Sequence, residues 1–168
     1  EARLVDVDND TDLDLVWSQD GNLVFRRNES TSGVAFADSE TVSPLRDQST
    51  AEIGTGQIGA AIAFDFADIN QDGVLDAAII DENQRIQVYL GNGAFDLLSG
   101  LVRLPDLENP FRDIVLPANT PMALKFANVF GDATPEVYVY ERDGGNGSYL
   151  RFFSAERDVI TGGLVYSD

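Results

Sequence analysis

The stretch that decides the fold is Asp68-Ile69-Asn70-Gln71-Asp72-Gly73-Val74-Leu75-Asp76. It places oxygen-bearing side chains at positions 1, 3, 5 and 9 of a nine-residue loop, with glycine at position 6. Ca²⁺ prefers six to eight oxygen ligands, which alternate side chains and one backbone carbonyl of a tight loop can supply. Glycine permits the sharp turn that aims such side chains inward. The stretch therefore predicts a calcium loop with these ligands: Asp68, Asn70, Asp72, Asp76 and the Val74 carbonyl.

Two more stretches of the chain align with this one. Asp6–Asp14 lies 62 residues before the quoted stretch, and Asn128–Glu136 lies 60 residues after it. Each stretch follows a short apolar segment and precedes another one. A charged residue stands three positions before each loop, and the three are Arg3, Asp65 and Lys125. Self-similarity at this spacing indicates a fold built from three similar units.

The first loop carries the same ligand pattern, and the third does not. In the first loop, Thr11 occupies the position where glycine is preferred, which we expect to strain the turn. Its expected ligands are Asp6, Asp8, Asp10 and Asp14 by their side chains and Asp12 by its carbonyl. In the third loop, Phe130 replaces the donor at position 3. We expect the loop Asn128–Glu136 to keep its shape and to bind no metal.

The alternative for one such stretch is a solvated acidic turn without a metal. Two copies at the same register of a repeat, each flanked by apolar strands, favour metal binding instead. Clustered aspartates repel one another by ~1 kcal/mol per pair at 4 Å even in water, and a dication reverses that sign. EF-hands are excluded because position 12, which needs a bidentate acid, falls on Trp17 and Ile79.

The segments between the loops predict an all-β fold. Ile86, Val88 and Leu90 alternate with more polar residues, which is typical of a half-buried strand. Asp20-Gly21 and Gly91-Asn92-Gly93 are turn formers, and no long window has helical apolar spacing. About four strands per ~60 residues is typical of β-propeller blades. We expect three blades of four antiparallel strands within one domain: 1–52, 53–116 and 117–168.

Composition excludes several classes of function. The chain has no His and no Cys, which removes the usual nucleophile triads, zinc sites and disulfide scaffolds. A formal charge of −18 opposes binding to nucleic acid or to an anionic membrane surface. No segment is long and apolar enough to insert into a membrane, and we expect none to do so.

The second loop, followed by Val88-Tyr89-Leu90-Gly91-Asn92-Gly93-Ala94-Phe95, resembles an FG-GAP or VCBS repeat, the blade unit of integrin-α-like β-propellers. The resemblance covers the chain as three consecutive units and is weakest in the third. It implies two structural Ca²⁺ ions, a secreted or cell-surface protein, and about seven blades in all. Three blades cannot close a ring, so we expect a part of a larger propeller. The remaining blades would come from the same or another chain.

The resemblance implies a calcium-stabilised adhesion module that recognises a protein or carbohydrate ligand. The alternatives are the scaffold of a secreted polysaccharide-acting enzyme and a structural subunit of an extracellular assembly. We identify no catalytic constellation, since Asp81, Glu82, Glu141 and Asp143 are expected to be solvated hairpin tips. Aromatic residues in strand patterns are expected in the core rather than on a sugar-binding face. They are Trp17, Tyr89, Tyr138, Tyr140 and Tyr149.

Asn28 and Asn146 match the N-glycosylation acceptor pattern at expected strand ends or turns. Either residue could carry a glycan if the source is eukaryotic, and the match could equally be accidental.

Overall fold

The structure is a computed structural model. It describes residues 2–6, 10–19, 22–29, 33–36, 41–43, 46–47, 63–81, 83–91, 101–117, 120–132, 134–142, 147–157 and 164–167. Within these residues the fold is all-β, without a helix, and so no helix that could cross a membrane is found there.

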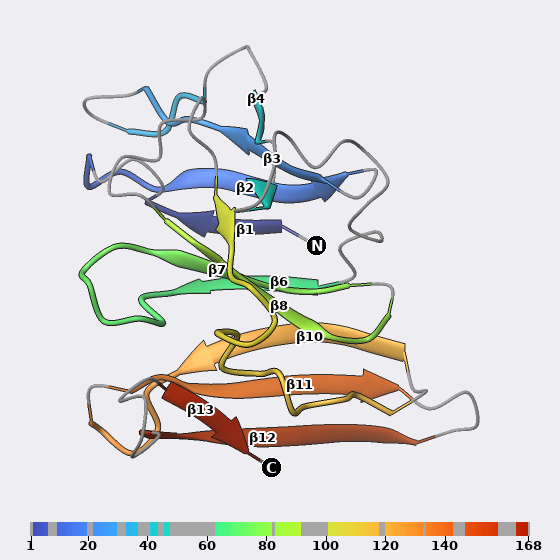
Figure 1. Ribbon diagram of the computed structural model, residues 1–168. Helices are drawn as coiled ribbons and strands as arrows, with labels where there is room; N and C mark the ends of the chain where they lie inside the picture. The colour runs from blue at the N-terminus through green and yellow to red at the C-terminus, as the bar shows by residue number, and fades with distance from the viewer. Residues whose placement is uncertain are drawn as a thin grey trace.

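In the part of the chain that the structure describes, thirteen strands form three sheets that lie one above another (Figure 1). Sheet 1 contains β1 (Ala2–Val5), β2 (Asp14–Gln19), β3 (Asn22–Arg26) and β4 (Thr41–Ser43). Sheet 2 contains β6 (Ala63–Ala67), β7 (Asp76–Ile80), β8 (Ile86–Leu90) and β9 (Val102–Arg103), with β5 (Arg46–Asp47) at its edge. Sheet 3 contains β10 (Thr120–Ala127), β11 (Glu136–Arg142), β12 (Ser148–Arg157) and β13 (Leu164–Ser167).

The topology follows the three units expected from the sequence. In each sheet four strands follow one another in chain order as an antiparallel meander, for example β10-β11-β12-β13. The exception is β5, which pairs in parallel with β9 of sheet 2, although its residues lie in the first expected unit. The all-β prediction is therefore confirmed.

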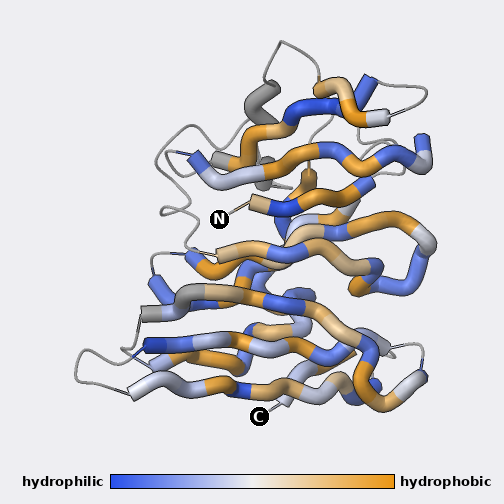
Figure 2. The backbone as a smooth tube through the Cα atoms, turned by 180° about the vertical axis from the view of Figure 1, so that it is seen from behind, coloured by the Kyte–Doolittle hydropathy of each residue, from blue (hydrophilic) through white to orange (hydrophobic). Residues whose placement is uncertain are grey.

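Sheet 2 is buried on both of its faces. One face of it, with Phe64, Ile79 and Tyr89, packs on Val16 and Phe25 of sheet 1. The opposite face, with Ala78 and Val88, packs on sheet 3. The expectation of a half-buried strand at residues 86–90 was wrong, because both neighbouring sheets cover β8 and even Gln87 is buried. Figure 2 shows the hydrophobic stretches that run along the strands of the stack.

The connection from β9 to β10 closes the core between sheets 2 and 3. It places Phe111, Ile114 and Leu116 in that core. The Phe111 ring stacks on Tyr166 of β13 at a centroid distance of 4.2 Å. Asn109 Nδ2 donates to the Ile86 carbonyl, which fixes the connection to sheet 2. A polar segment thus becomes part of the hydrophobic core through its few apolar residues.

The first strands of the three sheets meet at one carboxylate, that of Asp65. Its Oδ1 accepts from Arg3 Nε at 3.2 Å and lies 3.4 Å from Lys125 Nζ. Its Oδ2 accepts from the backbone amide of Phe126 at 2.9 Å. Arg3 and Asp65 are largely shielded from solvent, so the pair is only weakly screened. The equivalent charged positions of the three repeats therefore converge, and we call Arg3, Asp65 and Lys125 the hub.

Substitution of Asp65→Asn should lower the free energy of unfolding by about 2–4 kcal/mol, because it removes a largely shielded negative charge that pairs with Arg3 and Lys125. Urea unfolding followed by Trp17 fluorescence measures the loss. The control is Asp106→Asn, which breaks the pair with Arg103 at a largely exposed side chain and should cost less than about 1 kcal/mol. Equal losses in the two variants would contradict the role given to the hub.

Candidate metal loops

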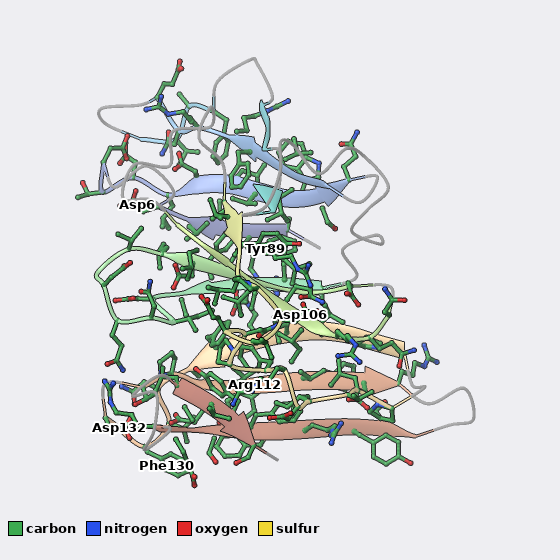
Figure 3. The ribbon with its side chains drawn as sticks, in the orientation of Figure 1. Asp6, Tyr89, Asp106, Arg112, Phe130 and Asp132 are labelled. Atoms are coloured by element: carbon green, nitrogen blue, oxygen red, sulfur yellow. The ribbon has the colours of Figure 1, made fainter. Side chains whose placement is uncertain are left out.

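The three repeated loops lie along one edge of the stack. Each connects the first and second strands of its sheet: β1 to β2, β6 to β7 and β10 to β11. Figure 3 shows Asp6 of the first loop and Asp132 of the third on the same side of the molecule. The second loop, residues 68–75, is described in full, whereas residues 7–9 and 133 lie outside the described residues. The expected ligand Asp8 is among those.

The carboxylate at position 1 closes the loop in the same way in the first two repeats. Asp68 Oδ1 accepts from the amide of Asp72 and Oδ2 from that of Gly73, each at 2.9 Å. Asp6 accepts from the corresponding amides of Asp10 and Thr11 at 3.2 and 3.0 Å. Hydrogen bonds of this kind hold the backbone in a tight turn around one side chain. The two loops therefore share a geometry as well as a sequence pattern.

The side chain at position 5 secures the following residues. Asp10, Asp72 and Asp132 accept from the amide two residues further on, at 2.9, 2.8 and 2.9 Å respectively. Asn70 Oδ1 accepts from the Asp72 amide, and its Nδ2 donates to Asp72 Oδ2 at 2.8 Å. The position 3 and position 5 side chains of the second loop are thus already in contact.

The carboxylate at position 9 is buried and anchors the loop to its sheet. Asp76 Oδ2 accepts from the amides of Ile69 and Asn70, and Oδ1 accepts from that of Gly91. Gly91 must be glycine, since a Cβ there would clash with the Leu75 carbonyl oxygen. In the first loop, buried Asp14 accepts from the Asn28 amide at 2.7 Å. These two aspartates tie the loop ends to the residues that follow β3 and β8.

Burial raises the pKa of Asp76 to about 6, and the nearby charge of Asp72 adds to the rise. The hydrogen bonds from Gly91, Asn70 and Ile69 oppose the rise, because they stabilise the ionised form. The carboxylate is therefore in a setting where its charge is costly and a nearby cation would be favourable.

The third loop keeps this shape in part, because positions 5 and 9 make the equivalent hydrogen bonds, whereas position 1 accepts from position 4 instead of positions 5 and 6. Glu136 replaces the aspartate at position 9 and accepts from the amides of Val129 and Phe130 through Oε2. At position 1, Asn128 Oδ1 accepts from the Gly131 amide. Phe130, at the ligand position 3, is exposed and makes an edge contact with Phe152. The prediction that this loop binds no metal stays a prediction.

Thr11 carries the strain that its position implies. Its φ is 76°, close to the 89° of the equivalent Gly73. A β-branched residue is rare in this left-handed region, and an L-residue pays about 1–2 kcal/mol to adopt it. Gln71 of the second loop and Gly131 of the third also have positive φ at a shared position.

The ligand atoms of the two loops suit a hard cation by their chemistry, but the acidic side chains that the structure describes are not gathered around a metal position. All the expected ligands are oxygens, the class that Ca²⁺ prefers, and each carboxylate oxygen can accept more than one partner. Among the residues that the structure describes, no three acidic side chains are close enough to form a metal-binding group.

A cavity of about 230 Å³ adjoins the second loop, between sheets 2 and 3. Leu90, Leu104 and Leu164 line its apolar part, and Gln71, Glu108 and Arg157 add polar groups. Arg157 Nη2 donates to Gln71 Oε1 at 2.6 Å, which links β12 to the loop. No local sequence pattern predicts this link, because it joins positions 86 residues apart.

Two acidic residues expected at solvated hairpin tips are buried instead. Asp81 accepts from the amides of Asn83 and Arg85 and from Gln87 Nε2, so it stabilises the turn between β7 and β8. Glu141 is fully buried, with Arg151 Nη1 3.9 Å from its Oε1. Both have structural roles in their sheets. Glu82 and Asp143 lie outside the described residues.

The aromatic residues divide between core and surface. Tyr89 is fully buried, as expected for a core position, whereas Trp17 and Tyr138 are only partly buried and belong to neither core cluster. Tyr140 and Tyr149 are exposed, so the core expectation was wrong for these two.

Asn28 is buried, and its Oδ1 accepts from the Ala35 amide. The folded chain therefore does not present it for glycosylation, and Asn146 is outside the described residues.

Comparisons with known proteins identify no family for this chain. No protein-family model matches the sequence, and no curated protein is significantly similar to it. The resemblance to FG-GAP and VCBS repeats stays a prediction that depends on the loop residues.

Reciprocal substitutions test the loop strain. Thr11→Gly should raise the free energy of unfolding by up to about 1 kcal/mol, the strain relieved minus the entropy cost of glycine. Gly73→Thr should lower it by about 1–2 kcal/mol, and since nothing lies within 4 Å of a Cβ there, the loss comes from backbone strain and not from a clash. Urea unfolding in chelator measures both. A loss of stability in Thr11→Gly would contradict this account.

Proposed function

We propose that this chain is a calcium-stabilised extracellular binding or adhesion module built from propeller-type blades. The three sheets are its blades, and the loops Asp6–Asp14 and Asp68–Asp76 are its metal sites. The calcium has a structural role, and the ligand is a protein or a carbohydrate. The module belongs to a larger assembly of blades from the same or another chain.

The observation that carries the proposal is the repeated loop geometry. Two loops in different sheets use the carboxylate at position 1 to hold the amides of positions 5 and 6. This arrangement gathers acidic side chains at one edge of a chain whose net charge is already −18. Without a cation the repulsion within each loop opposes folding, and a bound dication offsets it.

The hub supports the blade arrangement. Radial packing around a common axis brings the first strands of successive blades together, and Arg3, Asp65 and Lys125 come from the first strands β1, β6 and β10. The cavity beside the second loop is a candidate contact for the ligand. Its volume of about 230 Å³ suits one side chain or one sugar ring better than a larger molecule.

An extracellular location follows from the expected affinity. Sites of this kind in extracellular modules bind calcium with Kd of about 10⁻⁴–10⁻³ M, so they fill outside cells. At ten times Kd each site adds about 1.4 kcal/mol to the free energy of unfolding.

Chelation tests the metal sites. Two independent sites contribute about 3 kcal/mol, which for a domain of this size corresponds to a fall in Tm of about 6–12 °C when calcium is removed. Scanning calorimetry in 10 mM calcium and in chelator measures the difference, and magnesium serves as the control ion. Identical melting in both solutions would refute calcium binding.

Matched variants locate the sites. Asp72→Asn should reduce the calcium-dependent rise in Tm by about half, because it removes one charged ligand from one of two sites. The control is Asp132→Asn, which lies at the same position of the third loop and has the same hydrogen bond to the amide two residues on. It should leave the calcium response unchanged. A smaller response in Asp132→Asn would show that the third loop also binds calcium.

A further inference from the structure

We propose that this chain binds a second copy of itself head to tail, through the outer face of sheet 3 in one copy and that of sheet 1 in the next. The tail face consists of Tyr138, Tyr140, Leu150 and Phe152, and the head face of Leu4, Leu15 and Trp17. Like the proposed function, this inference rests on the repeated packing of the sheets. It does not depend on calcium or on a ligand.

The tail face is a continuous apolar surface on neighbouring strands. Tyr138 pairs with Phe152, and Tyr140 pairs with Leu150, across β11 and β12. Alternation along the strands directs these side chains away from Val137, Val139 and Phe153, which pack on sheet 2. Leu150 is 67% exposed and Tyr140 is 39% exposed. An exposed apolar surface of this kind on a soluble domain indicates an interaction site.

The equivalent surface of sheet 2 is an established interface. Ala78 and Ile80 occupy the positions in β7 that Tyr138 and Tyr140 occupy in β11. Val88 and Ile86 pair with them as Phe152 and Leu150 do in sheet 3. All four of these residues in sheet 2 are at most 1% exposed, because sheet 3 packs on them. The tail face therefore continues an interface that the chain forms once inside itself.

The chain also has the other half of that interface. The sheet 3 residues that cover sheet 2 include Phe126, Val137 and Val139. In the sheet 1 register, Leu4, Leu15 and Trp17 occupy these three positions. Leu4 is 58% exposed, and Leu15 and Trp17 are half-buried. The head face is thus similar to the surface that packs on sheet 2, and it faces away from the hub side chain of Arg3. It differs at one position, where Arg26 replaces Phe153 and lies 5.9 Å from the Trp17 ring centroid.

The repeated packing favours a head-to-tail interface over a symmetric one. In both internal interfaces, the face of one sheet that is equivalent to the tail face packs on the face of the next sheet that is equivalent to the head face. Neither interface joins two equivalent faces. Inside the chain, the carboxylate of Asp65 lies between Arg3 and Lys125. A joint between two copies instead brings Arg3 of one copy near Lys125 of the other, with no carboxylate of the hub between them. This repulsion and the charge of −18 on each copy make the joint weaker than the internal ones. We therefore expect reversible association at high concentration, strengthened by salt.

Analytical ultracentrifugation of the 168-residue chain tests the inference, at up to roughly 1 mM protein. We expect concentration-dependent dimers and larger species, and more of them in 1 M salt, where charges are screened within about 3 Å. Leu150→Arg and Leu4→Arg should each reduce association at least tenfold. Both side chains are exposed, so neither change removes a buried contact. The control is Leu107→Arg, an exposed position outside both faces.

Mixing the two variants separates head-to-tail from symmetric association. Leu150→Arg retains a head face and Leu4→Arg retains a tail face, so an equimolar mixture should form a dimer that grows no further. A chain that stays monomeric at every concentration would overturn the inference. So would association that depends on Leu150 alone, which would indicate a symmetric joint, or an equal effect of Leu107→Arg. None of these results bears on the calcium response, so the two proposals fail separately.

Discussion

The arrangement of the molecule depends on one shielded carboxylate, that of Asp65. It accepts from Arg3, Lys125 and the Phe126 amide, and so it holds together the first strands of all three sheets. Each loop begins three residues after its hub residue, at Asp6, Asp68 and Asn128. Fixing the hub therefore fixes the three loops along one edge, because a strand of three residues has little freedom in length or direction. The position of the candidate metal sites is a consequence of the hub.

The hydrogen bonds that shape these loops do not need the full set of expected metal ligands. The third loop lacks a donor at position 3, yet Glu136 and Asp132 hold its backbone as Asp76 and Asp72 do in the second loop. The buried carboxylate at position 9 is what sets the shape, since it satisfies amides that would otherwise be buried without partners. Position 5 also contributes to the shape, since Asp10, Asp72 and Asp132 each accept from the amide two residues further on. Only the donor at position 3 is lost in the third loop, where Phe130 replaces it.

The sequence predicted the repeats, the all-β class and the loop geometry because each depends on local patterns. The strain at Thr11 followed from one residue in a glycine position. The sequence shows charged residues at the equivalent positions Arg3, Asp65 and Lys125, but only the fold shows that Asp65 contacts the other two. Burial of sheet 2 on both faces was missed at residues 86–90, although the continuous apolar run Ala77–Ile80 is typical of a strand covered on both sides. Pairing of β5 with β9 has no local signal, since it joins distant segments.

Stacked sheets that contact mainly their neighbours gain stability as a nearly one-dimensional array. In such an array a middle unit buries two faces and an end unit one, which explains why β7 of sheet 2 is buried at every position while β11 is buried on alternate residues. The hub departs from this scheme, because Arg3 of sheet 1 also reaches the Leu124 carbonyl of sheet 3 at 3.5 Å. Strands near a common axis can interact across an intervening sheet, whereas strands far from the axis cannot. Cooperativity between the end sheets therefore has to pass through the hub or through both faces of sheet 2.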